Sequence, residues 1–182
     1  VLDYMGHTAI SDKLMDSRWG KLINNACMSG MSAACGCTFG EVLANDKARA
    51  CLSYLGYEVK KCCEAAGYKL PEVMLHDQSP ASLILGSQKV FDESQDMFLK
   101  MYAGMETAKA SMLQDLEKGR ITEVKMINGY VCQTGDEHGI DTPFNDKVVE
   151  IVTGIEQGKL PLDMSNLALF DSCEFPYELY KK

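Results

Sequence analysis

The sequence lacks the features of membrane, secreted and nucleic-acid-binding proteins. No apolar run in its 182 residues is long enough to span a bilayer, and the N-terminus has neither the basic nor the apolar region of a signal peptide. Basic residues are outnumbered: 18 lysines and arginines stand against 26 aspartates and glutamates, for a formal net charge of -8. Such a surface repels phosphate backbones and anionic headgroups, so we expect neither nucleic acid nor membrane as a partner.

Metal-binding and disulfide patterns are also missing, although the chain has eight cysteines. No Cys-x-x-Cys pair is matched by a second pair or by a histidine pair, and the spacing of Cys35 and Cys37 is too tight for a structural zinc knuckle. The histidines His7, His76 and His138 are scattered, and we expect them on the surface or in loops. We therefore predict no metal site, and interpret the cysteines as reduced, buried hydrophobes of a cytoplasmic protein.

Alternating strand patterns, internal repeats and low-complexity tracts are absent from the sequence. The length, with 46% hydrophobic and 24% charged residues, fits one globular domain with a substantial core. Apolar residues recur instead at helical spacing, between capping residues, prolines and glycines. The sequence therefore predicts an all-α fold, a multi-helix bundle.

The expected helices follow from these boundaries. A long first helix is predicted from a cap at Asp12 or Asp16 to about Ala34, with Gly36 ending it. Further helices, among them one opened by a Thr38 capping box and one opened by Pro143, are predicted over residues 38–44, 46–66, 87–102, 107–118, 122–134 and 143–158. On the helix 46–66 we expect the charged residues to face solvent: Lys47, Arg49, Glu58, Lys60 and Glu64.

The chain divides into a helical domain and short ends. We predict a helical substrate and catalytic domain over residues 1–160, of which 1–11 are the remnant of a linker. Residues 161–182 contain aromatic residues without periodicity, and we expect a C-terminal tail that packs on a neighbour or is partly disordered. Because the chain begins with Val1 rather than Met, we expect it to be cut from a longer protein.

Several polar residues stand where helices usually carry apolar ones. Lys21 and Asn25 are four residues apart, a spacing that places both on one helix face about 6 Å apart. A cation and an amide facing an apolar interior would suit an anionic or carbonyl-bearing ligand, whereas a solvated helix lysine is the ordinary alternative. Asn128 also stands in a helix interior, where asparagine is a weak helix former.

Two further polar residues have ordinary explanations when taken alone. Ser111 and Gln114 have the spacing of a capping box. Glu123 stands at a helix start, where the helix dipole favours a carboxylate. Neither residue alone indicates a catalytic site.

Five ordered blocks give these residues a common context. They are Trp19-x-Lys21-Leu22-x-x-Asn25, Ser111-Met112-Leu113-Gln114-Asp115-Leu116, Gly119-Arg120-x-Thr122-Glu123, Ile127-Asn128-Gly129 and Gly139-Ile140-x-Thr142-Pro143-x-Asn145. In this order and spacing they resemble the C-terminal domain of the 2-dehydropantoate 2-reductase, or ketopantoate reductase, family over about residues 17–160. The resemblance implies a helical domain similar to that of 6-phosphogluconate dehydrogenase, joined to an N-terminal Rossmann domain that holds NADPH.

The resemblance also implies roles for individual residues. Lys21 matches the catalytic lysine, which would donate a proton to the substrate carbonyl oxygen and stabilise the developing alkoxide. Glu123 matches the acid that binds a substrate hydroxyl and influences the charge state of the lysine. Ser111 matches the serine that binds the substrate carboxylate, and Asn25 and Asn128 match substrate-binding positions. None of these roles needs a metal.

The nucleotide-binding half is missing from the sequence, which has no G-x-G-x-x-G after a strand and no βαβ pattern. We therefore expect this chain alone to be inactive. Two departures from the family pattern, Ser29 (followed by Gly30) for a second asparagine and Ala108 for a polar residue, imply changed selectivity, because a hydrogen-bonding site rejects ligands that leave it unpaired.

The function implied is the substrate-binding and catalytic half of an NADPH-dependent reductase. It would convert 2-dehydropantoate or a related 2-oxo acid to the 2-hydroxy acid, in pantothenate and coenzyme A biosynthesis. Its partners would be the small 2-oxo acid, the N-terminal Rossmann domain and, in a homodimer, a second copy. The alternative is a helical dimerisation or interaction module of the same fold without reductase activity.

Overall fold

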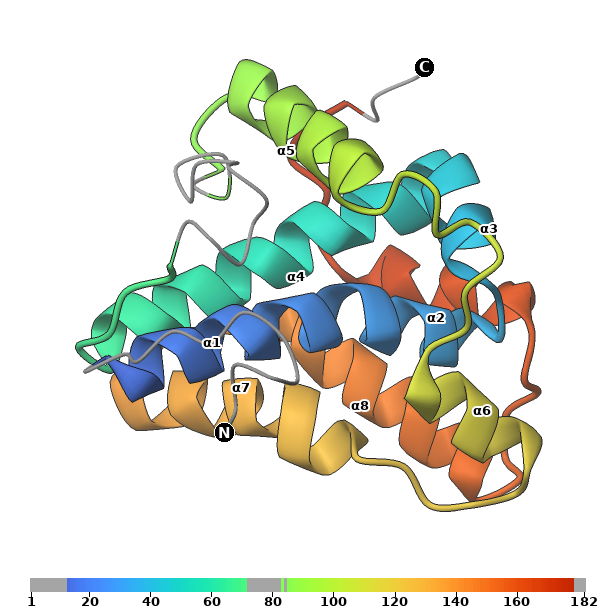
Figure 1. Cartoon of the computed structure of the whole chain (residues 1–182). Helices are drawn as coiled ribbons and strands as arrows, with labels where there is room; N and C mark the ends of the chain where they lie inside the picture. The colour runs from blue at the N-terminus through green and yellow to red at the C-terminus, as the bar shows by residue number, and fades with distance from the viewer. Residues whose placement is uncertain (1–12, 72–82, 84, 179–182) are drawn as a thin grey trace, which may run out of the picture.

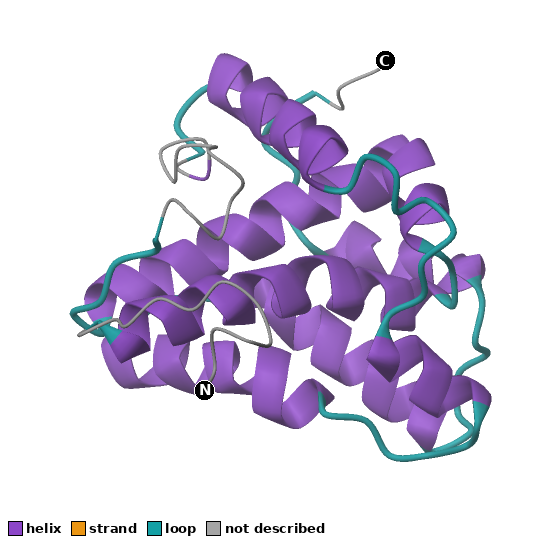
Figure 2. Cartoon of the chain, viewed as in Figure 1, coloured by secondary structure: helices purple, strands orange, loops and turns teal. Residues whose placement is uncertain are grey.

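The computed structural model describes residues 13–71, 83 and 85–178, and within this part of the chain it contains helices and loops but no strand (Figure 2). The predicted all-α fold is confirmed. The main elements, in chain order, are α1 (Leu14–Asn24), the π-helical turn η2 (Asn25–Ser29), α2 (Gly30–Cys35), α3 (Phe39–Ala44), α4 (Asp46–Ala65), α5 (Gln88–Met101), α6 (Ser111–Glu117), α7 (Val124–His138), α8 (Pro143–Glu156) and the 3-10 helix η5 (Met164–Ser172).

The segment from α1 through η2 to α2 runs through the middle of the bundle (Figure 1). The long helix α4 packs along one side of it, and α7 and α8 pair with each other on another side. The helix α5 packs on α4, and α6 packs against α2 and η2. Because neighbours cover this central segment on several sides, its residues Trp19, Ile23, Met28 and Met31 are buried in the core.

The predicted helix ends are largely confirmed. Thr38 and Glu41 form the capping box at the start of α3, with the Thr38 amide donating to Glu41 Oε2 at 2.7 Å. The side chain of Asn45 accepts hydrogen bonds from two amides at the start of α4. Gly36 ends α2 with a φ of +60°, and a β-carbon there would lie 2.6 Å from the carbonyl oxygen of Leu162. This turn therefore needs glycine for its backbone angle and for space.

Two helix starts differ from the prediction. The first helix begins at Leu14 after Lys13, so Asp16 lies in its first turn and does not cap it, and Asp12 lies outside the described residues. The helix α6 begins at Ser111 instead of residue 107, because residues 105–110 form a turn and an extended stretch before it. Both errors concern ends, where propensity carries little information.

The charged residues predicted to face solvent on α4 are partly buried. Arg49, Glu58 and Lys60 are buried, with exposed fractions of 2%, 4% and 7%. Arg49 Nη1 donates to the carbonyl of Leu43 at 2.6 Å, and Lys60 pairs with Glu64. The prediction was wrong because α4 is covered by η2, α5, α7 and α8, and charged residues on a helix so surrounded are buried and find partners.

The expectation that the C-terminal tail packs on a neighbour or is partly disordered is corrected for residues 161–178. Asp163 caps the helix η5, and Phe170 of that helix is completely buried. Its ring lies 6.3 Å from that of Phe144 on α8. The amide of Asn166 donates to the carbonyls of Ala34 and Pro161 at 3.0 and 2.7 Å. This segment therefore packs on its own domain.

All eight cysteines are reduced, and seven of them are buried, which confirms their interpretation as small buried hydrophobes. In the described part of the chain, no cluster of three His, Cys, Asp or Glu side chains could hold a metal ion. Of the helices described there, none is both long enough and apolar enough to cross a bilayer.

Candidate functional site

The central segment contains a π-helical turn, η2, directly after the helix that carries Lys21. The amide of Gly30 donates to the carbonyls of Asn25, five residues earlier, and of Cys27, and so does not bond the carbonyl of Ala26. Ala26 O instead accepts a hydrogen bond from Asn128 Nδ2 at 3.0 Å. The sequence predicted a continuous helix here, so the wider turn was not foreseen. Such π-helical turns are frequent at functional sites.

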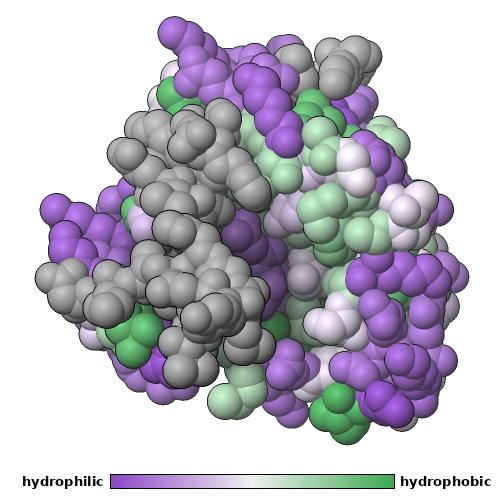
Figure 3. Space-filling view, in the orientation of Figure 1, coloured by the Kyte–Doolittle hydropathy of each residue, from purple (hydrophilic) through white to green (hydrophobic). Residues whose placement is uncertain are grey.

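A cavity of about 240 Å³ lies beside this turn. One wall is polar and comes from the central segment, with Asn24, Asn25 and Ser29. The same segment adds the apolar Met28, and the other wall is largely apolar and is formed by Phe39, Met101, Tyr102 and Met105. Figure 3 shows this face of the molecule, with apolar side chains exposed below α5. A pocket with amide and hydroxyl groups on one side and apolar groups on the other suits a small ligand with a polar and an apolar end.

The aromatic wall of this cavity is well ordered by packing. The rings of Phe39 and Tyr102 meet edge to face with their centroids 5.5 Å apart. Tyr102 is buried, and its burial raises the pKa of the phenol above its ordinary value of 10. The hydroxyl group therefore stays protonated and can serve a ligand as a neutral hydrogen-bonding group.

Lys21 lies in the last turn of α1 and is exposed, whereas Asn25 is half-buried in the cavity wall. The expectation that Lys21 faces an apolar interior is therefore corrected. Lys21 does not line the cavity, and among the residues that the structure describes it forms no ion pair. A solvent-exposed lysine one turn from an amide-lined cavity could reach a ligand only from the open side.

Ser111 and Glu123 are also exposed. Ser111 is the first residue of α6 and does not cap it, and Gln114 donates to the carbonyl of Lys109 at 3.2 Å, so the capping-box interpretation is wrong. Glu123 precedes α7, and its segment is held by Thr122, whose amide and hydroxyl both donate to Glu156 Oε1 at 2.7 Å. Neither Ser111 nor Glu123 lines the cavity beside Asn25.

Asn128 lies in the interior, with no exposed surface. Besides its bond to Ala26, its Nδ2 donates to Asn145 Oδ1 at 2.9 Å. Asn145 Nδ2 in turn donates to Glu58 Oε2 at 2.7 Å. The structure thus places Asn128 in a buried polar chain behind η2, and not on the surface with Lys21, Ser111 and Glu123.

Glu58 ends this chain of buried polar groups, and the sequence analysis missed its structural role. Its carboxylate accepts hydrogen bonds from the amides of Phe144 and Asn145, both at 2.9 Å, and so caps α8 from a different helix. The residue before α8, Thr142, makes no side-chain cap. The sequence offered one signal for the burial of Glu58. It is three residues after Leu55 and four before Cys62, and both of these lie on the buried face of α4.

Burial raises the pKa of Glu58 from its ordinary value of 4.5 to about 7. The hydrogen bonds from Phe144 and Asn145 favour the carboxylate and oppose this rise, whereas the nearby charge of Asp146 adds to it. The carboxyl group therefore holds its proton to a higher pH than an exposed glutamate does. Its role is to join α4 to α8 and to orient Asn145.

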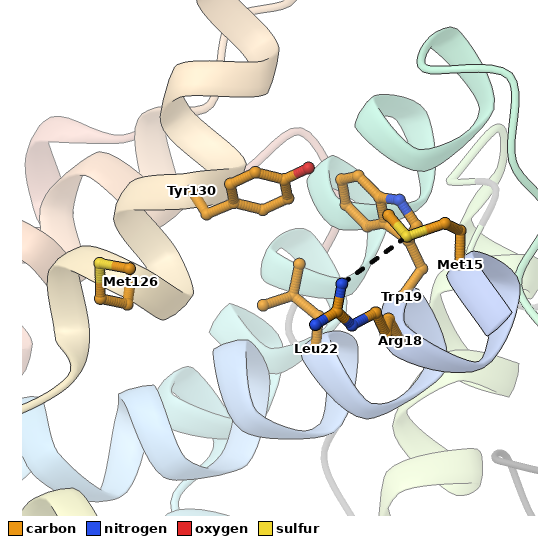
Figure 4. Close-up of a pocket in the computed structure, with 6 residues that line it drawn as sticks. All are labelled: Met15, Arg18, Trp19, Leu22, Met126 and Tyr130. Atoms are coloured by element: carbon orange, nitrogen blue, oxygen red, sulfur yellow. Dashed lines mark hydrogen bonds between the residues drawn. The ribbon is translucent and has the colours of Figure 1, made fainter.

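A larger cavity, of about 420 Å³, lies between α1 and α7 (Figure 4). Its lining residues are Met15, Arg18, Trp19, Leu22, Met126 and Tyr130. The rings of Trp19 and Tyr130 lie 5.6 Å apart, and the Met126 side chain is 78% exposed. This cavity contains none of the predicted site residues, and apart from Arg18 and the polar tips of Trp19 and Tyr130 its lining is apolar. Its size alone does not make it the better candidate.

The described residues do not form a dinucleotide-binding site. They include no strand, and so no glycine-rich turn between a strand and a helix that could hold a pyrophosphate.

Comparisons with known proteins match most of this chain to one family of domains. Residues 13–156 match the family model described as ketopantoate reductase PanE/ApbA C terminal. A 2-dehydropantoate 2-reductase of Archaeoglobus fulgidus is 30% identical over 140 residues, which are 77% of this chain and 40% of that protein. One of Streptococcus pyogenes is 27% identical over 147 residues, 78% of this chain and 40% of that protein. The chain thus spans about 40% of the length of these relatives.

Solved structures share the helical fold. A PanE/ApbA family ketopantoate reductase from Ralstonia eutropha JMP134 matches with a TM-score of 0.65 and 24% identity, over 82% of this chain and 43% of that one. A D-mandelate dehydrogenase, in a ternary structure with NADH and anilino(oxo)acetate, matches with a TM-score of 0.67 and 22% identity. The match covers 86% of this chain and 58% of that one. A dimeric ketopantoate reductase from Staphylococcus aureus matches with a TM-score of 0.63 and 19% identity, over 84% of this chain and 46% of that one.

Proposed function

Because the chain belongs to the ketopantoate reductase C-terminal domain family, we propose that it is the substrate-binding and catalytic half of a reductase. The reaction is the reduction of 2-dehydropantoate, or a related 2-oxo acid, to the 2-hydroxy acid, within pantothenate and coenzyme A biosynthesis. The observation that carries the proposal is the family match over residues 13–156, together with the cavity beside Asn25 and one turn from Lys21.

The reductant in this proposal is NADPH, bound mainly by an N-terminal Rossmann domain outside this chain. Two observations support a second domain: the chain spans about 40% of its relatives' length, and the proposed catalytic groups are exposed. Exposed groups act weakly in water, because solvent screens charge and competes for hydrogen bonds. A covering domain would exclude water from Lys21 and Glu123.

Lys21 is the proposed proton donor. As the substrate carbonyl carbon is reduced, the oxygen becomes an alkoxide, and a lysine ammonium beside it donates the proton and stabilises the developing negative charge. Glu123 would bind a substrate hydroxyl and influence the charge state of Lys21. Ser111, at the start of α6, would hydrogen-bond the substrate carboxylate.

The cavity beside η2 supports a substrate with an apolar side chain. Asn25 and Ser29 offer hydrogen bonds, and Met28 on the same turn, together with the facing Phe39 and Met101, offers an apolar surface. Ser29 and Ala108 depart from the family pattern, so we propose a 2-oxo acid whose alkyl or aromatic side chain packs on this wall. The D-mandelate dehydrogenase neighbour was solved with an aromatic 2-oxo acid derivative, anilino(oxo)acetate.

The test uses the protein joined to its N-terminal domain and follows NADPH oxidation at 340 nm with 2-dehydropantoate and with aromatic and branched 2-oxo acids. The substitution Lys21→Ala should lower kcat by about 10²- to 10⁴-fold, the range for loss of a general acid. Lys159→Ala is the matched control, because Lys159 is an exposed lysine after α8 and outside the proposed site. A Lys21→Ala protein with wild-type kcat would exclude the proposed role.

An inactive interaction module remains the second candidate. Met126, which is 78% exposed, borders the mainly apolar cavity lined by Met15, Trp19 and Leu22, and a contiguous exposed apolar surface of this kind can contact another protein. The same assay separates the candidates: the module predicts no turnover of any 2-oxo acid by a folded protein that binds NADPH. Sedimentation velocity, with Met126→Lys as the perturbing variant, would then measure self-association.

A further inference from the structure

The unusual feature of the central segment is the way in which the π-helical turn η2 is held. In a regular α-helix the carbonyl of Ala26 would accept a hydrogen bond from the amide of Gly30. That amide bonds to the carbonyls of Asn25 and Cys27 instead, and Ala26 O receives the side-chain amide of Asn128 at 3.0 Å. A side chain from α7 therefore supplies the donor that the regular helix would have used.

The orientation of Asn128 is set by a chain of buried groups. Its Nδ2 donates to Asn145 Oδ1 on α8, and Asn145 Nδ2 donates to Glu58 Oε2 on α4. Asn128 and Asn145 have no exposed surface, and Glu58 is 4% exposed. Because both hydrogens of Asn128 Nδ2 are used, the amide cannot be flipped without losing two buried hydrogen bonds.

Packing at Gly30 restricts the amide further. A β-carbon built on Gly30 would lie 3.1 Å from Asn128 Oδ1 and 3.2 Å from a methyl carbon of Val148. The absence of a side chain at Gly30 thus lets α7 approach the turn closely. A side chain at this position would force Asn128 or Val148 to shift, so glycine keeps the hydrogen bond from Asn128 to Ala26 possible.

The wider turn decides which residues line the cavity. Asn24 and Asn25, and then Met28 and Ser29, all line it, so two pairs of neighbouring residues reach the same wall. Closing the π turn to a regular α-helix would rotate one end of the segment relative to the other by about 100°, the angle of one residue. Such a rotation would move Lys21 relative to Ser29.

We propose that Asn128 is a positioning residue: it holds the π-helical turn Asn25–Ser29 open, and Asn145 and Glu58 fix the orientation of its amide. By holding the turn, Asn128 sets the placement of Lys21 and Asn25 relative to Ser29. Asn128 acts through the turn, without touching the substrate. The consequence for turnover rests on the proposed function, whereas the consequence for the turn does not.

The first measurement is amide hydrogen exchange of the whole protein, resolved at Gly30 and Met31. Asn128→Ala should speed exchange at these amides by about tenfold or more, because Ala26 O loses its donor. The matched control is Asn166→Ala, which removes another buried amide with two donated hydrogen bonds, one of them to Ala34 of α2. Its effect should appear at the end of α2 and in η5, and leave the π turn unchanged.

The second measurement is steady-state kinetics of the same variants. Asn128→Ala should lower kcat/KM by up to about 100-fold and change the ratio between two 2-oxo acids, as expected when catalytic groups are misplaced. Asn166→Ala should keep that ratio. If Asn128→Ala does not fold, Asn128→Leu replaces it, because it keeps about the size of the side chain and removes the donor to Ala26 without burying a charge.

The outcomes separate this inference from the proposed function. A wild-type protein without reductase activity refutes the proposed function, and the exchange measurement then decides the role of Asn128 alone. Equal exchange at Gly30 and Met31 in the Asn128 and Asn166 variants overturns the inference. An unchanged kcat/KM in a folded Asn128 variant of an active enzyme overturns it as well.

Discussion

Glu58 makes the stability of this protein depend on pH, and the substitution Glu58→Gln should remove that dependence. The carboxyl group is buried between α4 and α8, and burial raises its pKa from an ordinary 4.5 to about 7. Between these two values the folded protein keeps a proton that the unfolded chain has released. The free energy of unfolding therefore falls as the pH rises through this window, and the contribution is fully present only below about pH 4.5.

The size of the effect follows from the two pKa values. Each pKa unit corresponds to about 1.4 kcal/mol, so the whole window corresponds to about 3 kcal/mol. Most of this, roughly 2 to 3 kcal/mol, should be lost between pH 5 and pH 8. At a urea m value of roughly 2 kcal/mol/M, the difference moves the unfolding midpoint by about 1 M, which is readily measured.

The assay is urea unfolding of the wild-type and Glu58→Gln proteins at several pH values, followed by far-UV circular dichroism. Other groups titrate in both proteins, so their contributions cancel in the difference between the two free energies of unfolding. The wild-type protein should lose stability relative to the Glu58→Gln protein as the pH rises from 5 to 8. A constant difference over this range would refute the reasoning, since Glu58 would then titrate alike in the folded and unfolded states.

Three further predictions concern other parts of the molecule. Gly36→Ala should destabilise the protein by about 1 kcal/mol or more beyond the effect of Gly139→Ala, as measured by urea unfolding. Both glycines have positive φ, but only at Gly36 would the new methyl group meet the backbone of Leu162. Equal effects of the two substitutions would contradict this. Iodoacetamide should label the folded protein slowly at pH 8, even at the half-buried Cys132, because burial raises the pKa of its thiol and little thiolate is present. All eight cysteines should react in denaturant, and rapid labelling of several cysteines in the folded protein would contradict their burial. In the active protein, Ser29→Asn should raise kcat/KM for 2-dehydropantoate relative to aromatic 2-oxo acids, and an unchanged ratio would remove Ser29 from the selectivity argument.

Most of the fold could be predicted from local patterns. The start of α3 at the Thr38 and Glu41 capping box, the Asn45 cap of α4, the Ser87 cap of α5 and the first-turn Pro143 of α8 all involve residues within one turn of each other. The apolar faces of these helices followed from their periodicity, but on α4 the buried positions of Arg49, Glu58 and Lys60 did not. The tail was harder, because the residues of η5 carry no clear period and are held by contacts with Ala34 and Phe144.

The candidate site was predicted as a set of residues but not as an arrangement. The ordered blocks indicated Lys21, Asn25, Ser111 and Glu123, and these roles stay proposals. Their exposure in this chain could not be read from the sequence, because it depends on which surfaces the other helices cover. Asn128 was placed with them, whereas the structure puts it behind η2 in a buried polar chain.

The sequence by itself determined the helical class, most helix boundaries and the family, because each depends on residues close in the chain or on their order along it. The tertiary structure alone decided the partners of the buried polar groups. Glu58 meets the amide of Phe144 across 86 residues, and Asn128 meets the carbonyl of Ala26 across 102. No local pattern records such pairs, because a buried donor or acceptor takes whichever partner the packing of distant helices brings within reach.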